Sequence, residues 1–63
     1  MKIFYGVRTR IFDNLKVEVA KMTIEAETQP ENTFRETADY DEYNDWFSNE
    51  RDAHEFYADA VAG

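Results

Sequence analysis

Hydrophobic and polar side chains alternate along the first part of the chain. Over residues 2–12 the odd positions are Ile, Tyr, Val, Thr and Ile, and most of the even positions are polar or small. A period of two with β-branched and aromatic residues is typical of a half-buried strand. Asp13-Asn14 suits a two-residue hairpin turn, and a second apolar-rich run follows over residues 15–26. The pattern therefore predicts a β-hairpin over residues 1–27.

The tip of this hairpin does not continue the pattern of its open end. With Asp13-Asn14 as the loop, Val7 is expected opposite Ala20, and the open end has one continuous apolar face. Near the tip the apolar set changes to the other face and consists of Phe12, Leu15, Val17 and Val19.

Two explanations of this change stay open. A bulge near Arg8-Thr9 with a three-residue loop would return Val17 and Val19 to the main apolar face, because a one-residue slip moves every side chain to the other face. Alternatively, the hairpin is apolar on both sides and its tip carries a second apolar patch.

The middle of the chain is ambiguous between strand and helix. Residues 28–33 are expected to form a loop, since Pro30 cannot donate to a sheet ladder. In residues 34–47, Tyr40, Tyr43 and Phe47 have the spacing of one helical face, yet the aromatic content favours a strand. We interpret the segment as a third strand ending at Phe47, with a short helix as the alternative.

The last segment has the pattern of an amphipathic helix over residues 49–62. Ser48 or Asn49 is suited to be the N-cap, and acids follow in the first turn, where the helix dipole favours them. The apolar face consists of Ala53, Phe56, Tyr57 and Ala60. We therefore expect a single small α+β domain over residues 1–63, in which one C-terminal helix packs on a short antiparallel sheet.

Composition and charge exclude several classes of function. The 63 residues include 14 acids, 7 bases and no cysteine, which excludes disulfides and cysteine-based zinc sites. Residues 31–63 hold ten of the acids and only two of the bases. Such a field repels nucleic acid and anionic membrane and attracts basic protein surfaces. We expect a cytoplasmic protein that binds neither nucleic acid nor membrane directly.

Enzymatic and metal chemistry find little support. His54 follows Glu50 by one helical turn, but a zinc site needs further ligands. Ser48 is explained as a helix cap, and the acidic run from Asp39 lacks the glycine of an EF-hand calcium loop. We therefore expect no catalytic residues, no metal and no cofactor.

Acids and large aromatic residues are interleaved in the second half of the chain. This combination suits a surface that binds a basic, partly apolar protein, because Tyr and Trp dominate interface hot spots. A helix over residues 49–60 carries roughly one acid per 4.5 Å, whereas duplex DNA carries one charge per ~1.7 Å, so a dimer would be the better duplex mimic. The expected electrostatic contacts are Asp39, Asp41, Glu42, Asp45, Glu50, Asp52 and Glu55, and the expected aromatic anchors are Tyr40, Tyr43 and Trp46.

Two functions from different classes follow. The first is an inhibitor or modulator that occupies the basic, nucleic-acid-binding surface of a partner. In size and charge it looks like the small anti-defence proteins of phages and mobile elements, which target host-defence or nucleic-acid-handling proteins. The second is a structural homodimer or assembly subunit in which the acids serve only solubility. Its expected contact patch is Phe12, Leu15, Val17 and Val19.

Overall fold

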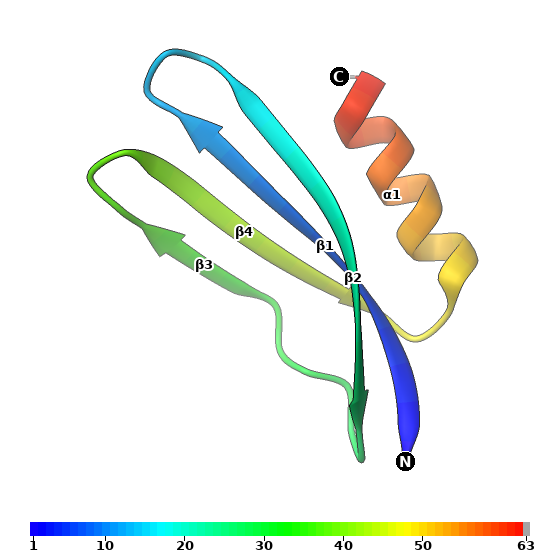
Figure 1. Ribbon diagram of the computed structural model, residues 1–63. Helices are drawn as coiled ribbons and strands as arrows, with labels where there is room; N and C mark the ends of the chain where they lie inside the picture. Colours follow the sequence, from blue (N-terminus) through cyan, green and yellow to red (C-terminus); the bar gives the residue numbers. More distant parts are fainter. Residues whose placement is uncertain (63) are drawn as a thin grey trace.

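A computed structural model describes residues 1–62 as a four-stranded antiparallel sheet with one helix packed on it, which confirms the predicted α+β class. The strand order is β2-β1-β4-β3 (Figure 1). The structure has two hairpins where the sequence predicts one hairpin and a third strand. The elements are β1 (Lys2–Phe12), β2 (Val17–Ala26), β3 (Thr33–Glu36), β4 (Tyr40–Phe47) and α1 (Glu50–Ala62).

The turn between β1 and β2 has three residues, so the expected two-residue loop is wrong. The Phe12 N–H donates to the Lys16 carbonyl at 2.8 Å, and the Leu15 N–H donates to the Phe12 carbonyl at 2.9 Å. Leu15 adopts a φ of 69°, the left-handed conformation that closes a three-residue hairpin loop. The pairing of β1 with β2 is continuous from Lys2 to Ile11, without the bulge that the sequence left open.

This register shifts the pairing of β2 with β1 by one residue from the predicted one. Val7 lies opposite Lys21 rather than Ala20. Val17 and Val19 share a face with Ile11, as the three-residue loop predicts, whereas Met22 and Ile24 turn to the opposite face. Both faces of the hairpin therefore carry apolar side chains, in different halves.

The second hairpin begins at Thr33, the last residue of the expected loop, and divides the ambiguous segment 34–47 into two strands. Thr37 closes its turn: the Thr37 hydroxyl donates to the Tyr40 carbonyl at 2.9 Å and accepts the Tyr40 N–H at 3.1 Å. The predicted end of the strand at Phe47 is confirmed. Ahead of β3, the side chains of Asn32 and Gln29 contact the Trp46 N–H and carbonyl at 2.8 Å and 3.0 Å, and so extend the ladder beyond the strand.

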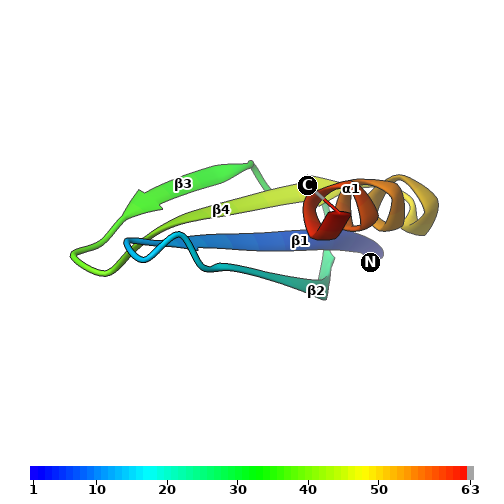
Figure 2. The same cartoon turned by 90° about the horizontal axis from the view of Figure 1, so that it is seen from above.

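The helix covers only part of one sheet face. Its 13 residues span about 20 Å, whereas the 11 residues of β1 span about 37 Å. Both hairpin turns lie at the end of the sheet away from α1 (Figures 1 and 2). Val7 and Ala53 are buried where the helix meets the sheet, and Phe56 packs on Phe47 with ring centroids 5.4 Å apart. The part of the helix-bearing face nearest the turns is not covered by α1 (Figures 1 and 2).

The opposite face holds a second, smaller apolar cluster. Phe4 is buried there, and the Trp46 ring lies against Gly6. A Cβ at Gly6 would stand 2.7 Å from a Trp46 ring carbon and 3.1 Å from the Met22 side chain, so only glycine fits under this ring without movement.

Candidate functional site

The sheet separates the charges of the chain between its two faces. Alternation along the paired strands puts four acids and one base on the face that carries α1, and the helix adds four acids and one base. The helix-bearing face therefore has a net charge of −6. The opposite face holds four bases and two acids, a net charge of +2. The acidity of the second half of the sequence thus becomes the acidity of one side of the molecule.

On the opposite face, four charges of alternating sign cross the sheet in one row. The register aligns Glu18 with Arg10, Arg10 with Glu42, and Glu42 with Arg35. Arg10 Nε lies 2.7 Å from Glu42 Oε1, and Arg35 Nη2 lies 3.5 Å from Glu42 Oε2. Opposite charges placed directly across strands stabilise a sheet and its register. This row neutralises its own charges.

Glu42 is the centre of that row and is not part of an accessible acidic surface. It is 7% exposed and also accepts a hydrogen bond from Asn44 Nδ2 at 3.3 Å. The hydrogen bond from Arg10 holds the pKa of Glu42 below its usual range and raises that of Arg10. The structure places this predicted contact residue inside the fold, where it stabilises the pairing of three strands.

Of the three expected anchors, only Tyr43 lies on the acidic face. Tyr40 and Trp46 point to the opposite face. There the Tyr40 ring packs on Phe12, 5.1 Å between centroids, with the Arg10 guanidinium 4.8 Å from its centre. Tyr43 pairs with Phe34, 4.8 Å between ring centroids, and both rings are exposed.

The other predicted acids gather on or beside the helix-bearing face. Asp41 and Asp45 project from β4, and burial raises the pKa of Asp45. Asp39 lies in the β3–β4 turn. The helix contributes Glu50, Asp52 and Glu55.

Two acids outside the predicted set, Glu36 and Asp59, join this surface. Glu36 lies opposite Asp41 in the pairing of β3 with β4, and Asp59 belongs to α1. The sequence already placed Asp59 on the predicted helix. Glu36 begins the acidic segment of the sequence, but the side of the sheet on which it lies depends on the turn at Thr37, which the sequence did not reveal.

The expected dimer patch is divided between the two faces and the turn. Phe12 packs on Tyr40, whereas Val17 and Val19 lie on the helix-bearing face. Leu15 projects from the turn and is 87% exposed. The open part of the helix-bearing face shares Val17 with the expected patch, and its exposed apolar members are Ile11, Val17, Phe34 and Tyr43.

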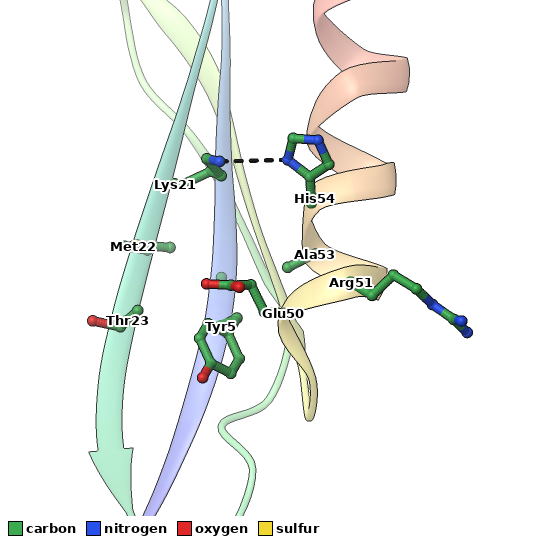
Figure 3. Close-up of a pocket in the computed structure, with 9 residues that line it drawn as sticks. Tyr5, Lys21, Met22, Thr23, Glu50, Arg51, Ala53 and His54 are labelled. Atoms are coloured by element: carbon green, nitrogen blue, oxygen red, sulfur yellow. Dashed lines mark hydrogen bonds between the residues drawn. The ribbon is translucent and has the colours of Figure 1, made fainter.

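An open groove of about 590 Å³ lies between α1 and the β1–β2 hairpin. Figure 3 shows Glu50 and His54 pointing from the helix towards the strands, whereas Arg51 points away. Lys21 Nζ lies 3.5 Å from His54 Nδ1 and 4.9 Å from the centre of the Tyr57 ring. The groove is lined by both charge signs, and its aromatic wall, Tyr5, comes from β1. The groove depends on the register of the hairpin, which places Tyr5 of β1 beside Thr23 of β2.

Neither a metal site nor a relative assigns a function. Residues 1–62 contain no group of three His, Asp or Glu side chains placed to hold a metal ion. The described helix lacks the length and apolarity to cross a membrane. Comparison with protein-family models, curated proteins and solved structures yields no match, so function has to be inferred from the chain's own residues.

Proposed function

We propose that this chain is a protein-interaction module that binds a basic surface of a partner protein through its helix-bearing face. One observation carries the proposal: the face that includes α1 has a net charge of −6, while the opposite face has a net charge of +2. A face of one sign attracts an oppositely charged partner and speeds the encounter. A domain that used acids only for solubility would not need them on one side.

The open end of that face supplies apolar contacts beside the acids. Phe34 and Tyr43 are 55% and 39% exposed, and they lie next to the row that contains Glu36 and Asp41. An aromatic pair flanked by carboxylates fits a surface that mixes Lys or Arg with apolar groups. Phe34 thus joins Tyr43 as an anchor, whereas Tyr40 and Trp46 lie on the opposite face.

The partner class follows from this chemistry. Basic surfaces with apolar patches are typical of proteins that bind the phosphates and bases of nucleic acids. A chain that occupies such a surface competes with nucleic acid and inhibits or modulates its partner. Small anti-defence proteins of phages and mobile elements act in this way, and the likeness rests on size and charge.

Affinity capture from a lysate of the organism that encodes the chain tests this function. The wild-type chain is compared with an acidic-face variant, Asp41→Lys, Glu55→Lys and Asp59→Lys. The control variant, Asp13→Lys, Glu27→Lys and Glu31→Lys, changes the net charge equally at exposed loop positions. Circular dichroism checks that all three chains fold alike.

The wild type and the loop variant are expected to capture the same nucleic-acid-binding protein, and the acidic-face variant is expected to lose it. Capture should weaken at high salt, because salt screens exposed charges, and the partner's own nucleic acid should displace the chain. Equal retention by both variants, or equal loss from both, would contradict binding through this face.

A further inference from the structure

The outer edge of β2 is the longest open edge of the sheet. β2 has ten residues at one end of the strand order, whereas β3, at the other end, has four. An open edge presents unpaired N–H and C=O groups that pair with another strand unless proline, charge or shortness prevents it. β3 is blunted by its shortness, whereas β2 contains no proline and carries charges of both signs, Glu18, Lys21 and Glu25. The edge of β2 therefore offers a template for strand addition.

The pairing with β1 determines which groups of β2 face outward. The Phe12 N–H donates to the Lys16 carbonyl at 2.8 Å, and hydrogen-bonded pairs alternate along an antiparallel ladder. Even-numbered residues of β2 therefore direct their N–H and C=O groups towards β1, and odd-numbered residues direct them outward. The outward set consists of Val17, Val19, Lys21, Thr23 and Glu25.

We propose that the edge of β2 binds the same edge of a second copy of this chain, antiparallel, with Thr23 opposite Thr23. In this register Lys21 of each copy lies opposite Glu25 of the other. On the other face Met22 lies opposite Ile24, and Ala20 lies opposite Ala26. These neighbours are of opposite charge, both apolar, or both threonine, and such pairs stabilise antiparallel strands.

Neighbouring registers lack this self-complementarity. A pairing centred on Lys21 sets two ammonium groups directly opposite each other, which is destabilising. A pairing centred on Met22 leaves Lys21 opposite Thr23 and Val19 opposite Glu25. The register centred on Thr23 gives both charged outward residues a partner of opposite sign, and it covers Ile24, which is 40% exposed in one chain.

The symmetry of this pairing adds to the acidic surface. The twofold axis of an antiparallel strand pair is perpendicular to the sheet, so both copies of α1 lie on the same side of an eight-stranded sheet. The dimer then carries twice the −6 of one helix-bearing face on a single side. Dimerisation itself does not depend on the proposed function, since it needs no other partner. It uses the strand edge in place of Phe12 and Leu15.

A charge swap across the interface tests the register in the full chain. Sedimentation velocity over a concentration series should show a dimer for the wild type. Lys21→Glu alone, or Glu25→Lys alone, should weaken the dimer by roughly tenfold or more, because each sets like charges opposite each other at two places. The double variant K21E/E25K should restore it. Since K21E also loses the contact with Tyr57, recovery in the double variant isolates the pairing of charges.

Hydrogen exchange supplies a second readout. The amides of Lys21, Thr23 and Glu25 should be protected at high concentration and exchange faster on dilution, while those of Met22 and Ile24 should not change. Thr23→Pro, which removes an outward donor and leaves the bonds to β1, should give a folded monomer by circular dichroism and sedimentation.

Several results would overturn the proposal. They are a wild-type chain that stays monomeric at the highest concentration, a dimer that the single charge reversals leave unchanged, and protection at a different set of amides. A monomeric chain whose β2 edge captures a strand of another protein would assign the edge to a different occupant.

Discussion

Glu42 shows how one carboxylate can hold three strands together. It lies on β4 between Arg10 of β1 and Arg35 of β3, and it accepts hydrogen bonds from Arg10 and Asn44. The bond from Arg10 lowers its pKa, so the ionised form is favoured by folding. Its stabilisation is complete above the unfolded pKa and disappears as pH falls through the folded pKa.

Glu42→Gln is therefore expected to destabilise the chain at pH 7 because it leaves Arg10 without its ion-pair partner. The difference from wild type should shrink as pH falls below about 4.5, the ordinary pKa of glutamate. Urea unfolding across a pH series measures this, with Glu36→Gln, an exposed glutamate of β3, as control. A loss that is the same at every pH would contradict an ionic role for Glu42.

The ionised carboxylate of Asp45 is expected to reduce stability, whereas that of Glu42 increases it. Burial raises its pKa, so its carboxylate opposes folding at pH 7, and the wild type gains stability as pH falls through the folded pKa towards 3.8. Asp45→Asn should stabilise the chain at pH 7, and the wild type should recover relative to the variant on acidification. The same unfolding series tests this, and Asp41→Asn provides a control on the same strand and face. A variant less stable than wild type at pH 7 would contradict it.

At the level of elements, how well the fold could be predicted depended on the turns. The period of two identified the first hairpin, and the spacing of Ala53, Tyr57 and Ala60 identified the helix, because each pattern follows from local geometry. The register failed because a leucine occupies the left-handed position of the first turn, where glycine or asparagine is usual. The second hairpin was hidden because the hydroxyl of Thr37, rather than glycine or proline, organises its turn.

Leu15→Gly should stabilise the first hairpin. Leucine at a φ of 69° is strained, its side chain is 87% exposed, and glycine adopts this conformation without a clash. The expected gain is about 1 kcal/mol, less the backbone entropy that glycine loses on folding. Chemical denaturation of the variant beside the wild type checks this. A loss of stability would show that Leu15 makes a compensating contact.

Asn49→Ala is expected to destabilise the helix. Asn49 Oδ1 accepts the Asp52 N–H at 2.8 Å, and its amide donates to the Asp52 carboxylate at 3.0 Å. Loss of an N-cap costs about 1 kcal/mol. Ser48→Ala is the matched control, since the sequence alone allowed either residue as the cap. Thermal unfolding followed at a helical wavelength compares them, and an equal loss from both variants would contradict this assignment of the cap.

For the whole molecule, the strand order determines which charges remain accessible. The sequence identified the acidic segment, yet it assigned Glu42 to the surface because Arg10 lies 32 positions away and meets it only when β4 pairs with β1. Tyr40 and Trp46 were misjudged for the same reason: alternation along β4 turns them away from Asp41 and Asp45. Local patterns reveal composition and periodicity, whereas a functional face also depends on which strands become neighbours.

The two faces should respond to salt in opposite directions, and the acidic face should dominate. Carboxylates of α1 and β4 repel one another across exposed surface, where salt reduces the Debye length from about 30 Å at 0.01 M to about 8 Å at 0.15 M. The short Arg10–Glu42 pair, at 2.7 Å and partly buried, is screened less. Sodium chloride should therefore raise the free energy of unfolding of the wild type at pH 7.

The variant with Asp41→Lys, Glu55→Lys and Asp59→Lys separates this charge effect from a general effect of salt. Reversing three acids brings the helix-bearing face to neutrality, so little repulsion remains for salt to screen. Its stability should change much less with sodium chloride than that of the wild type in parallel urea titrations. If the wild type instead loses stability as salt rises, the ion pairs of the opposite face contribute more than the repulsion between the acids. That result would contradict the prediction.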